Sequence, residues 1–164
     1  MEHCKCQENL IIEIAKEENV NEICQLLKTV SEDLHKRGIN QWTDEWKPEN
    51  IRELVLKHNF YVQRQEKNGE IIGLFSLEEN KILIDQFPNS LYLSKVAMLP
   101  KYQKKGLGAK MVQKAIDIVH SQGKIIVLDC WNGNQKLKDF YTKLRFKYIT
   151  DLPEYDYFIS VFSI

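Results

Sequence analysis

The sequence lacks an excess of either charge and any long apolar run. Its 164 residues include 23 basic and 23 acidic side chains, so the formal net charge is zero. A general nucleic-acid binder is disfavoured, because such proteins carry a large positive excess. No apolar run approaches the roughly 20 residues of a membrane helix, and the first residues do not resemble a secretory signal. We therefore expect a cytoplasmic protein with no nucleic-acid or membrane partner.

A cysteine framework is also lacking. The chain has four cysteines whose spacing is not that of a disulfide-bonded protein: Cys4, Cys6, Cys24 and Cys130. His3, Cys4 and Cys6 could form half of a zinc site, but zinc needs about four ligands and no second pair is present. We therefore predict no metal, a flexible amino-terminal tail over residues 1–9, and a single domain over residues 10–164.

Hydrophobic periodicity predicts a mixed α/β chain. Apolar residues three and four apart predict helices that begin near Val20, at Pro48, at Gly106 and at Asn134. Extended runs predict strands over residues 10–15, 60–65, 70–77, 91–98, 124–130, 146–150 and 155–162, with a further short strand over 82–84. The Asn-Gly pair at 68–69 is typical of a type I′ hairpin turn. The order β-α-α-β-β-β-α-β-α-β-β indicates a sheet flanked by helices.

The segment from Leu93 to Lys110 has the pattern of an anion-binding site. Gly106 and Gly108 lie where a strand and loop lead into a helix, and the first turn of a helix has unpaired N–H groups. Six lysines and no acidic residue occur between Leu93 and Ile116. The pattern favours a phosphate or pyrophosphate, although it matches neither the P-loop nor the dinucleotide fingerprint. The alternative is a glycine turn before a surface helix with solvated lysines.

Two motifs resemble those of the GNAT superfamily of N-acetyltransferases. The first is Gln103-Lys104-Lys105-Gly106-Leu107-Gly108, which is similar to the family's Gln/Arg-x-x-Gly-x-Gly/Ala signature. The second runs from Asn134 to Phe146 and is similar to Asn-x-x-Ala-x-x-Phe/Leu-Tyr-x-x-x-Gly-Phe, with Leu137 and Arg145 in place of alanine and glycine. The resemblance covers about residues 10–162. It implies an α/β fold with a mixed, mostly antiparallel central sheet, flanking helices, and a splayed strand pair that holds CoA.

The resemblance also implies that acetyl-CoA is the cosubstrate. Strand backbone would pair with the pantetheine arm, the glycine loop would hold the pyrophosphate, and Asn134 would contact the arm. The expected cofactor-binding residues are Val96, Ala97, Met98, Gln103, Lys104, Lys105, Gly106, Leu107, Gly108, Ala109 and Asn134. Tyr141 is expected to protonate the leaving thiolate, and the Met98 N–H to stabilise charge on the carbonyl oxygen. The alternative for Tyr141 is a packing residue. Arg145 is expected to change the cap of its helix.

The general base stays open among Glu78, Glu79, Asp129 and an ordered water chain. The family often has a glutamate on the strand before the signature, where this chain has Tyr92 and Ser94. The acceptor side is expected over residues 19–59 and the facing hairpins. We expect Trp42 and Glu78 to contact the acceptor, and Trp46 to fill the core.

These features together predict a cytoplasmic acyltransferase. We expect an acetyl-CoA-dependent N-acetyltransferase that acts on the primary amine of a small molecule by direct attack, as a monomer or a homodimer. Two alternatives are a protein lysine or N-terminal acetyltransferase and a non-catalytic sensor of acyl-CoA. An amine panel in a thiol-release assay separates the enzyme from the sensor.

Overall fold

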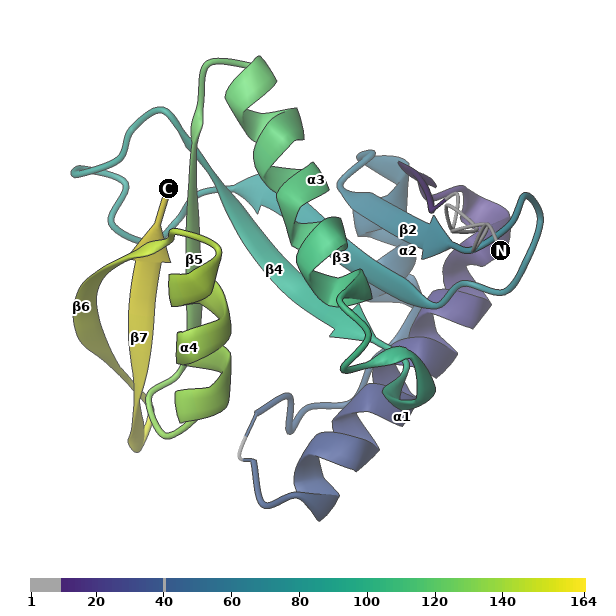
Figure 1. Cartoon of the computed structure of the whole chain (residues 1–164), viewed down its shortest axis with the longest axis horizontal. Coiled ribbons are helices and arrows are strands. Elements are labelled where there is room, and N and C mark those ends of the chain that lie inside the picture. Colours follow the sequence, from purple (N-terminus) through teal and green to yellow (C-terminus); the bar gives the residue numbers. More distant parts are fainter. Residues whose placement is uncertain (1–9, 40) are drawn as a thin grey trace, which may run out of the picture.

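The computed structural model describes residues 10–39 and 41–164. The tail predicted over residues 1–9, with His3, Cys4 and Cys6, lies outside the described residues. One sheet has the strand order β1-β2-β3-β4-β5-β7-β6, and helices cover both of its faces (Figure 1). Neighbouring strands are antiparallel except for β4 and β5, which are parallel. The mixed, mostly antiparallel α/β fold predicted from the sequence is confirmed.

The elements follow the predicted order. They are β1 (Ile11–Ile14), η1 (Glu17–Asn19), α1 (Val20–Lys36), α2 (Pro48–Leu56), β2 (Phe60–Arg64), β3 (Gly73–Glu79), β4 (Ser90–Met98), η2 (Pro100–Tyr102), α3 (Leu107–Ser121), β5 (Ile125–Trp131), α4 (Gln135–Lys143), β6 (Lys147–Glu154) and β7 (Tyr157–Ser163). Pro48 occupies the first turn of α2, where its missing N–H costs nothing.

The sheet separates two apolar clusters. The cluster on the α3 side contains Met111, Val112 and Ile116, which pack on Leu93 and Leu128 of the sheet. The cluster on the α1 side packs α1 and α2 against the other face, through Ile23, Leu27, Ile51, Val55, Phe60, Val62 and Leu74. Each fully buried aliphatic or aromatic side chain contributes about 1.5–3 kcal/mol. The two clusters hold the helices on opposite faces of the sheet.

A β-bulge in β4 changes which face its side chains point to. Two residues of β4, Lys95 and Val96, lie opposite Phe75 of β3 alone. Side chains alternate along a regular strand, so Leu93 and Ala97 would share a face. Instead Leu93 packs in the α3-side cluster and Ala97 in the α1-side cluster. The extra residue therefore reverses the alternation.

Two predictions about loops are wrong. The type I′ hairpin needs positive φ at both central residues, but only Asn68 has it, at 61°, and Gly69 does not. Pairing between β2 and β3 ends at Gln63 and Gly73, so a longer loop joins the strands. Residues 82–84 form turns rather than a strand, and the Phe87 N–H donates to the Leu83 carbonyl at 2.9 Å.

The expected change in the cap of α4 is also wrong. Arg145 adopts the left-handed conformation usual for glycine, with φ of 74°. The N–H of Phe146 donates to the Tyr141 carbonyl at 3.1 Å, and the N–H of Arg145 donates to Thr142 at 3.0 Å. These bonds end a helix in the ordinary way. The arginine keeps the cap at the cost of backbone strain.

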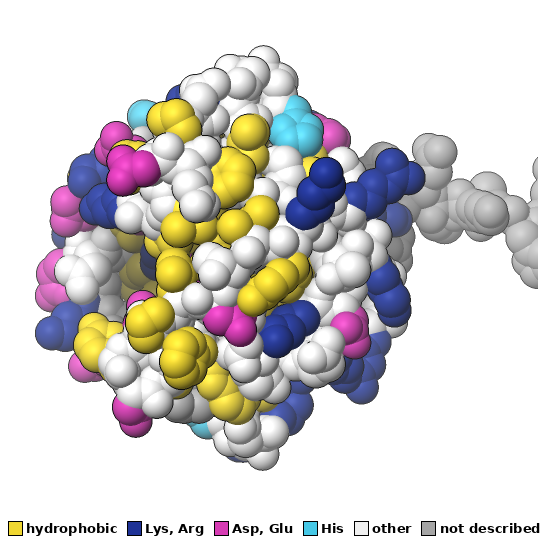
Figure 2. All heavy atoms as spheres, turned by 90° about the vertical axis from the view of Figure 1, so that its left-hand side faces the viewer, with side chains coloured by type: hydrophobic (Ala, Val, Ile, Leu, Met, Phe, Trp, Pro, Cys, Tyr) yellow, Lys and Arg dark blue, Asp and Glu magenta, His cyan; other side chains and the backbone are white. Residues whose placement is uncertain are grey.

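Exposed aromatic side chains lie on the C-terminal hairpin. Figure 2 shows apolar side chains gathered over this face, and Tyr148, Tyr155 and Phe158 of the hairpin are more than half exposed. Within the part of the chain that the structure describes, no helix is both long and apolar enough to cross a membrane.

Candidate active site

The parallel strands β4 and β5 diverge after a short pairing. They pair only from Ser90 with Ile125 to Tyr92 with Val127. Beyond Tyr92, β4 stays paired with β3 while β5 follows β7, and the two strands separate (Figure 1). Among the residues that the structure describes, no strand therefore pairs with this edge in the second half of β4.

The backbone of Met98 lies on that open edge. The Leu99 N–H donates to the Ile72 carbonyl next to β3 at 2.8 Å. Because successive N–H groups of an extended chain point to opposite edges, the Met98 N–H points away from β3, toward the opening. The Met98 carbonyl accepts from Gln103 Nε2 at 2.8 Å. Gln103, an expected cofactor residue, therefore ties the glycine loop to the end of β4 with its side chain.

The glycine loop has the geometry of an anion site. Gly106 precedes α3 with φ of 77°, and Lys104 is also left-handed, at 62°. The first bond of the helix runs from the Lys110 N–H to the Gly106 carbonyl at 3.2 Å, so the amides of residues 107–109 have no partner within the helix. A Cβ added at Gly108 would meet only Phe140 Cζ, at 4.0 Å. The start of α3 is thus open to a pyrophosphate, which its partial positive charge would attract.

The side chains around this loop divide into two groups. Leu107 and Ala97 are buried, so only their backbone can contact a cofactor. Lys101 pairs with Glu70 at 3.3 Å and is diverted from the anion site. Four lysines stay exposed on the loop and helix: Lys104, Lys105, Lys110 and Lys114. The residues present therefore fit a CoA phosphate, with fewer lysines than the sequence indicated.

Tyr141 and Asn134 are held by α4. Tyr141 is buried and packs against Phe146, with ring centroids 5.5 Å apart, and more loosely against Phe162. Burial raises the pKa of its hydroxyl well above the usual value, so the group stays protonated. Asn134 caps α4 by accepting the Leu137 N–H on Oδ1 at 3.1 Å. Its side chain thus has a structural partner that the sequence reading did not foresee.

A cavity of about 260 Å³ joins the two faces of the sheet at the opening between β4 and β5. Helix α4 contributes Leu137 and Tyr141 from one side, and the loop between α1 and α2 contributes residues from the other. The described residues that line it are Gln41, Trp42, Trp46, Tyr92, Ser94, Lys95, Val96, Asp129, Leu137 and Tyr141. The structure therefore brings together Val96, Trp42 and Tyr141, which were predicted to serve cofactor, acceptor and catalysis.

A hydrogen bond joins the diverging strands inside this cavity. The Tyr92 hydroxyl of β4 donates to Asp129 Oδ2 of β5 at 2.6 Å. Burial raises the pKa of the Asp129 carboxyl above its usual value, while the bond from Tyr92 acts in the opposite direction. Burial and the nearby carboxylate raise the pKa of Tyr92 far above its ordinary value. The tyrosine therefore stays protonated and donates, and the Asp129 carboxylate accepts this hydrogen bond.

Glu78 lies behind the cavity rather than in its lining. Its Oε2 accepts from Ser94 Oγ at 2.9 Å and from Lys95 Nζ at 3.2 Å. The Ser76 and Ser94 hydroxyl oxygens lie 2.7 Å apart and extend the network across β3 and β4. Glu78 thus reaches the cavity only through Lys95 and Ser94. Glu79, another candidate base, is exposed at the end of β3 and does not line the cavity.

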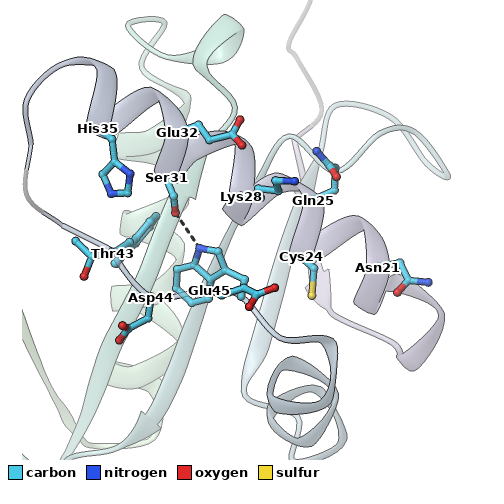
Figure 3. Close-up of a pocket in the computed structure, with 12 residues that line it drawn as sticks. Asn21, Cys24, Gln25, Lys28, Ser31, Glu32, His35, Thr43, Asp44 and Glu45 are labelled. Atoms are coloured by element: carbon cyan, nitrogen blue, oxygen red, sulfur yellow. Dashed lines mark hydrogen bonds between the residues drawn. The ribbon is translucent and has the colours of Figure 1, made fainter.

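Two tryptophans close the cavity on the α1 side. Trp42 and Trp46 meet edge to face with centroids 5.5 Å apart. Trp46 Nε1 donates to Ser31 Oγ of α1 at 2.8 Å, the bond drawn as a dashed line to Ser31 in Figure 3. Trp42 has φ of 55°, a strained conformation for a bulky residue. His35, near the same loop, bonds the Gln41 carbonyl at 2.9 Å.

The tryptophans also separate the cavity from a second hollow. This outer groove, of about 400 Å³, lies between α1 and residues 42–46, and Glu32, Asp44 and Glu45 are among its polar side chains (Figure 3). Trp42 and Trp46 line both spaces. Trp46 packs against the α1-side cluster but is only partly buried, so it does more than fill the core as the sequence predicted.

Sequence reasoning did not assign a role to Tyr92 or Lys95 and left Asp129 among several bases. Tyr92 and Ser94 alternate with the apolar residues Leu91 and Leu93 in β4, which was the available signal for a lined cavity. The position of Lys95 depends on the bulge, which no local pattern indicates. The contact between Tyr92 and Asp129 depends on the pairing of two strands distant in sequence.

Comparison with known proteins places this geometry in context. The family model described as Acetyltransferase (GNAT) family matches residues 20–146. A Bacillus subtilis (strain 168) protein named uncharacterized N-acetyltransferase YesJ is 28% identical over 141 residues, which cover 80% of this chain and 78% of that protein. Among solved structures, yncA from Salmonella typhimurium, a putative acetyltransferase with its cofactor acetyl-CoA, has a TM-score of 0.74 at 20% identity, covering 95% and 93% of the two chains. PaiA N-acetyltransferase from Thermoplasma acidophilum, in complex with coenzyme A, has a TM-score of 0.73 at 15% identity, covering 93% and 98%.

Proposed function

Because the chain belongs to the acetyltransferase (GNAT) family, we propose that this acetyl-CoA-dependent N-acetyltransferase acts on the primary amine of a small molecule. The observation that carries the proposal is the cavity lined from both faces of the sheet. Tyr141 and the open edge of β4 lie on the cofactor side, and Trp42 lies on the acceptor side. An amine that enters beside Trp42 would meet the thioester at the opening between β4 and β5.

Asp129 is the base in this proposal. An ammonium group must lose a proton before its nitrogen can attack, and a buried carboxylate with a raised pKa is a stronger base than an exposed one. Asp129 lines the cavity, whereas Glu78 is engaged by Lys95 and Ser94, and Glu79 is exposed. The bond from Tyr92 fixes the orientation of the carboxylate.

Two further groups act on the thioester, which acetyl-CoA supplies as the electrophile. The Met98 N–H on the open edge of β4 would donate to the carbonyl oxygen as negative charge develops there. Tyr141 would donate its proton toward the sulfur, because the raised pKa keeps its hydroxyl protonated. The amides of residues 107–109 would hold the pyrophosphate at the start of α3.

The size of the cavity favours a small acceptor over a protein. Its volume, about 260 Å³, lies below the roughly 300–1,000 Å³ usual for drug-sized ligands. Trp42 and Trp46 line the side from which the acceptor would enter, where a peptide would need an open groove. The sensor alternative has no specific support, because the proposed base and acid share one cavity. The homodimer stays a prediction.

Two measurements test the proposal in sequence. Thermal-shift titration should raise the melting temperature with acetyl-CoA or CoA and not with ATP or NAD, since a ligand of the native state stabilises it by mass action. A thiol-release assay with a panel of small amines and lysine peptides should then give turnover only with small amines. Stabilisation by ATP or NAD alone, or turnover only with peptides, contradicts the proposal.

A further inference from the structure

The cavity contains two charged side chains of opposite sign. Lys95 lies on β4 and Asp129 on β5, which diverge at this point. The rest of the lining is apolar or neutral, with two indoles, Leu137 and Val96 among it. A simple amine would pair with Asp129 but would carry no hydrogen-bond acceptor for the ammonium of Lys95. A ligand that carries both an ammonium and a carboxylate would satisfy both residues.

The backbone is distorted at the residue that supplies the positive charge. In a regular strand Lys95 would point to the face opposite its neighbour Ser94. The bulge instead lets both line the same cavity, and Lys95 adopts φ of 54°. A left-handed conformation at a residue other than glycine is strained and is kept where the surrounding structure requires it. Bulges beside active sites commonly redirect a side chain in this way.

The ammonium of Lys95 is fixed in place and still has capacity to bind. It donates to Glu78 Oε2 at 3.2 Å and contacts Ser94 Oγ at 3.4 Å, and its side chain is 20% exposed. An ammonium has three donors, so one is available to a ligand. Glu78 and Ser94 hold the group from behind, as a supporting shell orients a binding residue.

We propose that the acceptor is a free amino acid with an apolar or aromatic side chain, whose carboxylate binds Lys95 while its amine lies at Asp129. Its side chain would contact Trp42 and Trp46. This inference rests on the proposed function and names its substrate class. An amine without a carboxylate is disfavoured, because it desolvates the third donor of the Lys95 ammonium without offering it an acceptor.

Matched pairs of acceptors test the proposal. Leucine is compared with isoamylamine, and phenylalanine with phenethylamine, so that each pair differs only in the carboxylate. The value of kcat/KM for acetyl transfer should be about 10- to 100-fold higher for the amino acid, as expected for a hydrogen bond to a charged group. In the Lys95→Met variant this ratio should fall toward one, mainly through KM of the amino acid.

Three variants control for structural effects. Lys95→Arg keeps the charge and should retain part of the preference. The double variant Lys95→Met with Glu78→Gln removes the carboxylate that the single variant leaves unpaired, and should show the same loss of preference. Lys147→Met, at an exposed position of β6 outside the cavity, should keep the wild-type ratio. Calorimetric titration of the CoA-bound protein with leucine should give binding that Lys95→Met removes.

The outcomes separate this inference from the proposed function. Transfer to the simple amines that equals or exceeds transfer to the amino acids overturns the inference and leaves the proposed function standing. An unchanged ratio in the folded Lys95→Met and double variants also overturns it. Absence of transfer to both members of every pair, with no binding of leucine, overturns the inference. Absence of stabilisation by CoA thioesters overturns the proposed function itself.

Discussion

Replacing Tyr141 with phenylalanine isolates the hydroxyl that we propose as the proton donor. The ring is held by Phe140, Phe146 and Phe162, at centroid distances of 5.3, 5.5 and 6.3 Å, and phenylalanine can keep all three contacts. The folding free energy should therefore change by less than about 1 kcal/mol, and the Kd of acetyl-CoA should stay nearly the same.

The turnover number should fall by about 100-fold. General acids contribute about 10²–10⁴-fold, and burial raises the pKa of Tyr141, which makes it a weaker donor and places it at the low end of that range. A 100-fold loss corresponds to about 2.7 kcal/mol in the barrier. The deficit should shrink for thioesters with more acidic thiols, because these leave without a proton.

The assay is thiol release under saturating acetyl-CoA and an active amine, with Kd measured separately by calorimetry. Tyr148→Phe is the matched control, because it makes the same chemical change at an exposed position of β6. A Tyr141→Phe protein with full turnover, or with weakened cofactor binding and unchanged turnover, would refute the assignment. Either result would reduce Tyr141 to a packing residue.

Three other substitutions test separate parts of the site. Gly108→Glu should abolish CoA binding while the protein stays folded, because only Phe140 Cζ lies near the added Cβ and the new carboxylate repels the pyrophosphate; calorimetry that detects micromolar affinity contradicts it. If Asp129 is the base, kcat/KM should rise as pH increases through the raised pKa of its carboxyl. Tyr92→Phe removes a hydrogen bond that lowers this pKa, so the rise should move to higher pH. A pH–rate profile that the substitution leaves unchanged argues for another base. Ser31→Ala removes the acceptor of the Trp46 N–H, so urea unfolding should show a loss of stability of about 1 kcal/mol. Steady-state kinetics should show a higher KM for the amine. An unaltered KM would mean that this hydrogen bond does not affect the acceptor site.

The sequence predicted best what local patterns determine. The stripes of α1 and α3 repeat at helical spacing, and Pro48 and the glycines mark where elements begin and end, so the element order could be inferred without contacts. The position of the glycine loop likewise follows from two glycines between a strand and a helix. The predicted function class came from the resemblance of two short motifs, both of which lie on the expected elements.

What the sequence could not supply depends on strand pairing. The bulge at Lys95 and Val96 exists only because β4 pairs with β3 around Phe75, and it decides which side chains enter the cavity. Tyr92 and Asp129, 37 residues apart, meet through the parallel pairing of their strands. The Asn-Gly pair predicted a tight hairpin turn from its local preference. The pairing of β2 with β3 ends at Gln63 and Gly73, before this pair, so the tight turn does not form.

The opening through the sheet also bears on kinetic order. If the cofactor enters from the α3 and α4 side and the amine from the Trp42 side, the two reactants do not share an entrance, and neither has to leave before the other arrives. Both are then present together at the moment of transfer, so double-reciprocal plots at several acceptor concentrations should intersect rather than run parallel. An inert analogue of the acceptor should not compete with acetyl-CoA. The two reactants would then reach the opening from opposite faces of the sheet, and either could bind first, depending on their concentrations.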